Sequence, residues 1–211
     1  MFDEKPKTMH GPMLSFPSPN RVLPTVLPPG FVVFLDLDGT LVDTDYANYL
    51  SYRSALREVT NGLYHVDFTT ERLTRESLRR RIPALTDEQL ERIASLKSEY
   101  FSRFLPKTRL NNDLANLIMS YYSENAVVLV TRCRKKRAVE VLQYHQLLTR
   151  FTRLICREDL SPVNLYNKYE SAITMMAVSR DKVLVFENDE NDVEQAKVAG
   201  VPSSNIYRIS F

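Results

Sequence analysis

The sequence lacks the features that mark membrane and secreted proteins. Its longest uninterrupted apolar runs, at 31–35 and 126–130, have five residues each, whereas a membrane-spanning helix needs about 20. Residues 1–29 hold charges and prolines, but no apolar stretch of the ~7–15 residues that a secretory signal requires. These absences exclude a transmembrane protein and predict a cytoplasmic protein with no membrane partner.

Cysteine and net charge are also scarce. Cys133 and Cys156 could form only one disulfide, and a chain of 211 residues with 44% hydrophobic content does not need a disulfide to stabilise its fold. We therefore expect free thiols. The 28 Lys and Arg residues against 26 Asp and Glu leave a formal net charge of +2, so no overall field attracts nucleic acid. A nucleic-acid partner would have to rely on local basic patches.

Proline and apolar residues divide the chain into unlike parts. Seven of the eleven prolines fall within 1–29, which predicts an extended or disordered leader, either a docking segment or an unstructured arm. Four runs rich in apolar residues then follow, and apolar residues at three- and four-residue spacing between them predict helices. Strands that alternate with helices indicate an α/β fold with a parallel sheet. The four runs lie at 31–35, 126–130, 152–156 and 182–186.

The interval 46–106 interrupts this alternation because it contains no strand-like run. Thr86 with Gln89 forms a capping-box pattern ahead of an apolar face that extends to Phe104. Thr69 or Thr70 is expected to cap an earlier helix. We therefore predict a helical insert. The expected division is a leader at 1–29, an α/β core at 30–45 and 107–211, and the insert at 46–106.

Two acidic residues follow the first predicted strand. Asp36 and Asp38 come at its carboxyl end, with Gly39 and Thr40 next, and this edge of a parallel sheet is where such folds bind ligands. Two neighbouring carboxylates repel each other unless a cation or a proton compensates them. A divalent metal is the natural compensator.

These residues belong to a longer pattern that resembles a known family. The segment FLDLDGTLVDTD, 34–45, resembles the first motif of the haloacid dehalogenase-type phosphatases. Thr131 after AVVLV, Lys168 in NLYNKYESAI, and the acidic stretch VLVFENDENDVEQAKVAG are similar to the second, third and fourth motifs. The resemblance extends over about 31–202. It implies a Rossmann-like core of three layers, with the insert acting as a small α-helical cap.

The resemblance also implies a reaction and a role for each site residue. Asp36 would be the nucleophile that forms an aspartyl-phosphate, and Asp38 the acid–base, a role that needs a raised pKa. The implied activity is Mg²⁺-dependent hydrolysis of a phosphomonoester on a small phosphorylated metabolite. The remaining implied residues are Thr131, Arg132 and Lys168 for the phosphoryl group and substrate, and Asp36, the Asp38 carbonyl, Glu187, Asn188 and Asp192 for Mg²⁺.

Competing activities are only partly excluded. Dehalogenases of this family lack the second aspartate, and phosphonate hydrolases of similar plan use a cap lysine, whereas 46–96 contain none. Asn188 replaces the usual aspartate, so weaker metal binding is expected unless Asp189 or Asp192 compensates. Tyr169 replaces the proline that often follows the motif lysine, which is a second departure from the family pattern. A catalytically weak or inactive binding protein, a phosphomutase and a nucleic-acid end phosphatase remain alternatives. Substrate identity and oligomeric state stay open.

The first helix after Thr131 begins with an unusual run of positive charge. Arg132 and residues 134–137 supply five cations at a helix start, where the helix dipole favours negative charge. An anionic neighbour would explain the run, either a substrate reached by Arg132 or a nucleic-acid end, and an exposed basic turn is the equal alternative.

Overall fold

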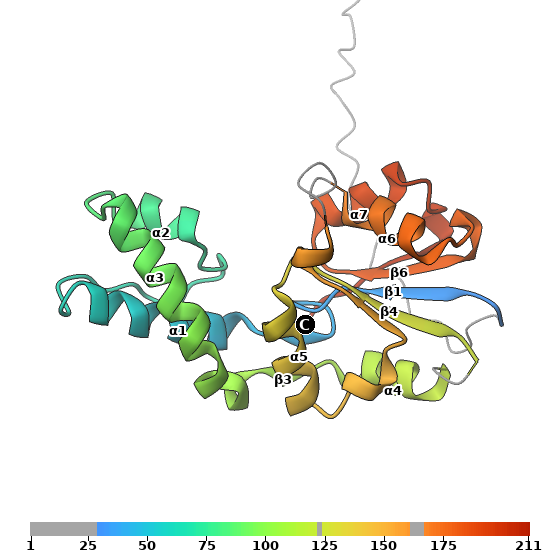
Figure 1. The fold of residues 1–211 in the computed structure, drawn as a ribbon, viewed down its shortest axis with the longest axis horizontal. Coiled ribbons are helices and arrows are strands. Elements are labelled where there is room, and N and C mark those ends of the chain that lie inside the picture. The colour runs from blue at the N-terminus through green and yellow to red at the C-terminus, as the bar shows by residue number, and fades with distance from the viewer. Residues whose placement is uncertain (1–28, 122–123, 161–166) are drawn as a thin grey trace, which may run out of the picture.

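A parallel sheet of five strands organises most of the chain (Figure 1). The computed structural model describes residues 29–121, 124–160 and 167–211, so the predicted leader lies, except for Pro29, outside the described residues. The strand order is β5-β4-β1-β6-β7, and every neighbouring pair is parallel. The strands are β1 (Val32–Leu35), β4 (Ala126–Val130), β5 (Arg153–Ile155), β6 (Val183–Glu187) and β7 (Ile206–Arg208). The predicted α/β fold is confirmed.

Helices cover both faces of this sheet and create three layers. Side chains of a strand alternate between the two faces, so Val33 and Leu35 of β1 enter one apolar cluster while Phe34 enters the other. Both faces are therefore buried, which explains why β1 reads as a continuous apolar run. The helices on the first face are α4 (Asn112–Tyr121) and α5 (Lys135–Tyr144), and those on the second are α6 (Lys168–Met176) and α7 (Glu190–Val198).

A separate group of helices, here termed the helical lobe, stands to the left of the sheet in Figure 1. It has its own apolar core, to which Leu56, Leu78, Leu90 and Ile93 contribute. The lobe consists of α1 (Asp45–Val59), α2 (Arg75–Arg81) and α3 (Asp87–Tyr100), and the 3₁₀ helix η1 (Phe101–Lys107) leads back to the sheet. Two short antiparallel strands, β2 (Val42–Asp43) and β3 (Arg109–Leu110), lie at its base.

One helix start differs from its prediction. Thr74, rather than Thr69 or Thr70, caps α2, because its side chain accepts a hydrogen bond from the Ser77 N–H at 3.0 Å and Ser77 Oγ accepts one from the Thr74 N–H at 2.7 Å. The helix therefore begins at Arg75, four to five residues later than a cap at Thr69 or Thr70 would place it. No helix in the described part of the chain is long and apolar enough to cross a membrane.

The capping box at Thr86 matches its prediction and allows a stability test. Thr86 Oγ1 accepts a hydrogen bond from the Gln89 N–H at 3.2 Å, and Gln89 Oε1 accepts one from the Thr86 N–H at 3.0 Å. We expect Thr86→Ala to lower the free energy of unfolding by about 1 kcal/mol. Ser95→Ala, on the exposed side of α3, should change it by less than about 0.5 kcal/mol. Equal effects in urea titrations of the two variants would contradict the cap.

Candidate active site

Three neighbouring strands end at one edge of the sheet and carry candidate residues there. Asp36 follows β1, and its N–H donates to the Phe186 carbonyl at 3.1 Å. Thr131 follows β4, and its N–H donates to the Ile155 carbonyl at 3.0 Å. Glu187 is the last residue of β6. Parallel pairing therefore brings together residues that lie far apart in the sequence.

A tight turn after Asp38 shapes the same edge. Gly39 has φ +87°, a conformation that costs glycine little, and its N–H donates to the Val42 carbonyl at 2.8 Å. A Cβ at Gly39 would lie 2.6 Å from Nδ2 of Asn188. The glycine thus permits both the turn and the close approach of Asn188.

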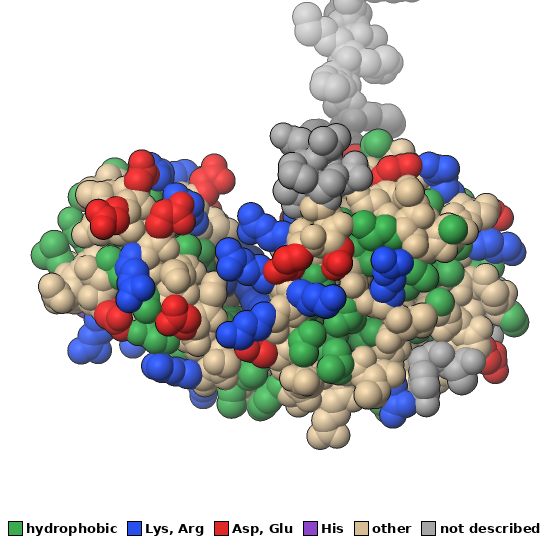
Figure 2. Space-filling model, viewed as in Figure 1, with side chains coloured by type: hydrophobic (Ala, Val, Ile, Leu, Met, Phe, Trp, Pro, Cys, Tyr) green, Lys and Arg blue, Asp and Glu red, His purple; other side chains and the backbone are tan. Residues whose placement is uncertain are grey.

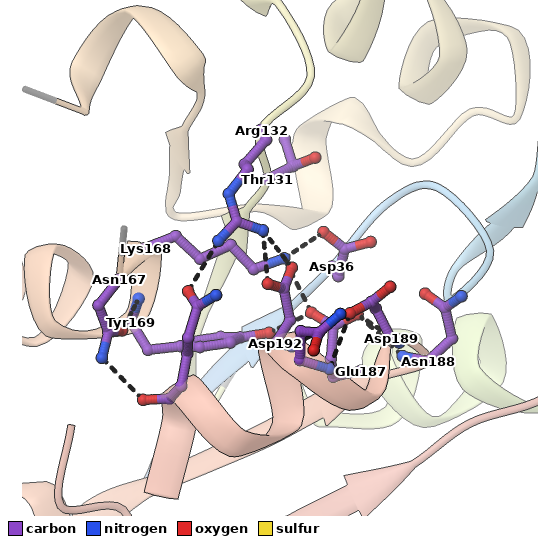
Figure 3. A network of polar contacts seen from close by, with 12 residues as sticks. Asp36, Thr131, Arg132, Asn167, Lys168, Tyr169, Glu187, Asn188, Asp189 and Asp192 are labelled. Atoms are coloured by element: carbon purple, nitrogen blue, oxygen red, sulfur yellow. Dashed lines mark hydrogen bonds and ion pairs between the residues drawn. The ribbon is translucent and has the colours of Figure 1, made fainter. Parts of the chain in front are cut away.

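Lys168 joins three carboxylates at the centre of the site (Figure 3). Its Nζ lies 2.7 Å from Asp36 Oδ1, 2.8 Å from Glu187 Oε2 and 2.9 Å from Asp192 Oδ2, and its side chain is 1% exposed. Burial alone would lower the pKa of Lys168, but the three carboxylates raise it above its ordinary value. The ammonium is therefore held charged, and the predicted third-motif lysine lies within the site.

The start of α6 fixes Lys168 in place. The Asn167 side chain caps this helix by accepting hydrogen bonds from the Tyr169 and Glu170 N–H groups, each at 3.1 Å, and Asn167 Nδ2 donates to the Gln195 carbonyl of α7 at 2.8 Å. Lys168 is the first residue of the helix. Its side chain is thereby directed toward the ends of β1 and β6.

Glu187 accepts hydrogen bonds at both of its oxygens. Oε1 receives the N–H groups of Asn188 and Asp189 at 2.9 and 3.1 Å. Oε2 receives the Tyr169 hydroxyl at 2.6 Å in addition to Lys168. The tyrosine that replaces the usual proline of the motif therefore contacts Glu187 directly.

The cations of the basic run meet carboxylates of the chain itself. Arg132 Nη1 lies 2.6 Å from Asp192 Oδ2, and Arg137 Nη2 lies 2.6 Å from Asp38 Oδ1. The Lys135 N–H at the start of α5 donates to Glu158 Oε2 at 2.9 Å. The expected anionic neighbours are thus, at least in part, protein side chains.

Asp38 has an environment opposite to the one expected for it. Burial would raise the pKa of Asp38, but Arg137 at 2.6 Å, Arg72 at 3.3 Å and the donating Thr44 hydroxyl hold that pKa well below its usual range. The expected raised pKa is therefore wrong for this structure. The reason is that two arginines, one from the helical lobe and one from α5, face this carboxylate.

Asp36 instead carries the raised pKa. Burial and the charge of Glu187 raise the pKa of Asp36 to about 7, although Lys168 opposes the shift. A buried group with a strongly shifted pKa at a sheet edge is a typical feature of a functional site.

The residues fit a divalent cation through a smaller ligand set than the sequence implies. The described residues contain no group of three or more acidic, histidine or cysteine side chains arranged to hold a metal, and Lys168 and Arg132 engage both oxygens of Asp192. The Asn188 amide nitrogen can donate to the Asp38 carbonyl and to Glu187 Oε1, each at 3.2 Å. In this orientation the amide nitrogen occupies the point that both oxygens face, and the amide places its own oxygen there when it is turned. Oxygen donors of this kind suit Mg²⁺.

A cleft of about 260 Å³ opens between the helical lobe and the sheet edge. Figure 2 shows blue Lys and Arg side chains gathered in this hollow. Arg137 of the basic run lines this cleft, together with Arg72 and Lys97, which were not among the predicted site residues. Lys97 carries a recognisable signal, because it lies four residues after Ile93 and four before Phe101, on the apolar face of α3. Arg72 carries none, since it lies in the segment between α1 and α2.

Together the fold and the site define a Rossmann-like α/β enzyme class with paired carboxylates at the carboxyl edge of its sheet. A family model described as haloacid dehalogenase-like hydrolase matches residues 32–206. The chain belongs to this family, and the resemblance inferred from its motifs is confirmed. The comparison with curated protein sequences gave no significant match.

Solved structures support the same fold. A predicted phosphoglycolate phosphatase from Haemophilus somnus aligns with a TM-score of 0.66 and 18% identity, covering 85% of this chain and 88% of that one. A β-phosphoglucomutase from Clostridium difficile gives 0.62 and 18%, covering 81% of each chain. A haloacid dehalogenase-like hydrolase from Streptococcus pneumoniae gives 0.63 and 15%, also covering 81% of each. At these identities the similarity concerns the fold.

Proposed function

We propose that this protein hydrolyses phosphate monoesters, with Asp36 as the nucleophile. The observation that carries the proposal is the buried cluster in which Lys168 holds Asp36, Glu187 and Asp192. Membership of a hydrolase family and likeness to proteins described as phosphatases support it.

The covalent step follows from the position of Asp36 at the end of β1. An oxygen of the Asp36 carboxylate attacks phosphorus, the bond from phosphorus to the ester oxygen breaks, and the leaving oxygen receives a proton from the protonated form of Asp38. Asp38 lies two residues away and faces the same cleft. Asp38, ionised by that transfer, then takes a proton from the water that hydrolyses the aspartyl-phosphate, which returns it to the protonated form for the next cycle. Arg137 and Arg72 stabilise the ionised form that accepts this proton and oppose the protonated form that donates it.

Cations and hydrogen-bond donors around Asp36 are suited to bind the phosphoryl oxygens. Thr131 and Arg132 line the cleft together with Lys168. Their charges and hydroxyl would offset the negative charge that gathers when a phosphate approaches a carboxylate. Lys168 would contribute without moving, because it is already fixed beside the nucleophile.

Mg²⁺ is the proposed cofactor, which Asp36, the Asp38 carbonyl and the Asn188 amide oxygen would hold, with Glu187 as a nearby acidic group. When bound, it would supply positive charge that keeps Asp36 ionised and offsets the charge of the phosphate. Asp192 is assigned instead to Lys168 and Arg132, whose positions it fixes through its two oxygens.

We further propose that the helical lobe is the cap, with boundaries near 46 and 106. The lobe contributes Asn48, Tyr52 and Lys97 to the cleft, while the sheet edge contributes the carboxylates. A lobe placed in this way can exclude water from the reaction and contact the part of the substrate beyond phosphorus.

The direct test of hydrolysis is phosphate release from a panel of esters. Purified full-length protein with Mg²⁺ is incubated with aryl phosphates, sugar phosphates and short phosphorylated acids, and inorganic phosphate is measured. Release from at least one ester is expected. Absence of release from all of them would favour a binding protein that retains the fold, and isomerised sugar phosphate without release would favour a mutase.

The substitution at Asn188 predicts a change in metal affinity. Asn188→Asp adds a carboxylate beside the Asp38 carbonyl, so we expect Mg²⁺ to bind about tenfold more tightly by calorimetry, because ligand charge raises affinity for hard cations. Asn191→Asp makes the same chemical change at an exposed position of α7 and should leave the titration unchanged. If both variants behaved alike, Asn188 would lie outside the coordination shell.

A further inference from the structure

A second group of cations, distinct from Lys168 and Arg132, surrounds Asp38. Arg72 comes from the segment before α2, Lys97 from α3 and Arg137 from α5, so distant parts of the sequence supply them to one cleft. Lys168 and Arg132 instead contact Asp36 and Asp192. The cleft therefore has one cationic group at the proposed nucleophile and another around Asp38.

The charges of this second group are not balanced. Asp38 forms ion pairs with Arg137, at 2.6 Å, and with Arg72, at 3.3 Å. Asp45 forms a further ion pair with Arg72. Lys97 forms no ion pair with any residue that the structure describes. Its Nζ lies 5.1 Å from the Tyr52 ring centroid. Burial and the charges of Arg137 and Arg72 lower the pKa of Lys97 to about 7, although the charge of Asp38 opposes the shift.

Arg137 also has donor capacity that the protein leaves unused. Its guanidinium carbon lies 4.1 Å from the Phe101 ring centroid, and its side chain is only 18% exposed. Within the described part of the chain, its Nε is buried without a hydrogen-bond partner. Because buried donors are normally satisfied, the described residues alone do not complete the contacts of this guanidinium, which lines the cleft.

Resting on the proposed ester hydrolysis, we propose that the substrate carries a second anionic group, a carboxylate or a phosphate, beyond the ester oxygen. Lys97 and Arg137 bind this group, with Arg72 beside them. Asp38 is the residue that serves the leaving oxygen, so whatever is attached to that oxygen meets the cations around Asp38. An anion gains charge-assisted hydrogen bonds there, whereas a neutral group leaves the ammonium of Lys97 desolvated and unpaired.

A binding experiment tests this subsite independently of turnover. The full-length protein is titrated by calorimetry with three non-hydrolysable probes of similar size: propylphosphonate, phosphonopropionate and propane bisphosphonate. We expect at least one of the two probes that carry a second anionic group to bind about tenfold or more tightly than propylphosphonate, which carries only one. The better of the two identifies the second group as a carboxylate or a phosphate.

Two lysine variants test whether Lys97 is responsible for the preference for probes with a second anionic group. Lys97→Met should reduce the tenfold preference to about twofold or less. Lys136→Met removes the same charge from the surface of α5, where the side chain is 81% exposed, and should keep the preference. Equal affinity of the wild-type protein for all three probes, no binding of any probe, or equal loss in both variants would overturn the proposal.

The same probes separate this proposal from the proposed function. Tight binding of a probe with two anionic groups, without phosphate release from any ester, would reject the proposed hydrolysis and support the proposed subsite. Hydrolysis of matched neutral and anionic esters with the same kcat/KM, together with equal probe binding, would keep hydrolysis and reject the subsite.

Discussion

Asp36→Asn is expected to reduce turnover of any accepted phosphate ester by about 10⁴-fold or more, because the variant cannot form the covalent intermediate. The substitution keeps the shape of the side chain and leaves an oxygen that can accept from Lys168. Initial rates of phosphate release, measured with Mg²⁺ at saturating ester, provide the test. Retention of a tenth or more of the activity would reject Asp36 as the nucleophile.

The folded state of this variant distinguishes lost chemistry from lost structure. The pKa of Asp36 is raised from 3.8 to about 7 by burial and by Glu187, so the folded protein binds more protons than the unfolded chain between pH 4 and 7. Its contribution to stability therefore falls as pH rises through this window. Asparagine does not titrate, so at pH 8 we expect the variant to unfold at a temperature at least as high as the wild-type protein.

A matched aspartate substitution controls for the general loss of a negative charge. Asp181 is exposed and lies just before β6, at the amino end of that strand. Asp181→Asn should leave turnover unchanged. A comparable loss in this variant would mean that net charge, rather than the nucleophile, governs the rate.

The main features of the fold follow from patterns that operate over short stretches of sequence. The run at 126–130 coincides with β4, because a strand buried on both faces needs apolar residues in succession. β7 (Ile206–Arg208) and the two-residue strands β2 and β3 have no such signal. They are short and depend on neighbours supplied by other parts of the chain.

The site was predictable to the extent that its residues follow strands. Asp36 and Thr131 come directly after β1 and β4, and Glu187 ends β6, so sheet topology is enough to bring them together. The side-chain partners were not predictable in the same way. Arg137 meets Asp38 across 99 sequence positions, and the resulting low pKa of Asp38 depends on where the helical lobe and α5 lie. No local pattern contains that information.

The two departures from the family motifs illustrate the same limit. Tyr169 and Asn188 were recognisable in the sequence as unusual residues, but their contact with one acid was not. In the structure the Tyr169 hydroxyl donates to one oxygen of Glu187, and the side-chain amide nitrogen of Asn188 can donate to the other at 3.2 Å. Both departures therefore add hydrogen bonds around a carboxylate that has 1% of its side-chain surface exposed, where unsatisfied charge would be costly.

Lys168→Met is expected to have the largest effect on stability. The variant keeps the length of the side chain but removes the cation that Asp36, Glu187 and Asp192 share, and breaking a buried ion pair on one side costs about 3–5 kcal/mol. We expect a loss of this size in the free energy of unfolding at pH 8, measured by urea titration. Lys197→Met, on the exposed side of α7 with its partner Glu194 at 3.0 Å, should lose less than about 0.5 kcal/mol.

The dependence of this loss on pH identifies its electrostatic origin. Without Lys168, the pKa of Asp36 rises further above its unfolded value, because burial and Glu187 then act without opposition. The folded variant takes up a proton that the unfolded chain does not hold near neutral pH, so its stability increases as pH falls from 8 toward 5. The difference between wild-type protein and variant should accordingly shrink over this range. A difference that stays constant from pH 8 to pH 5 would mean that Lys168 acts through packing of its alkyl chain, and that the three carboxylates do not depend on its charge.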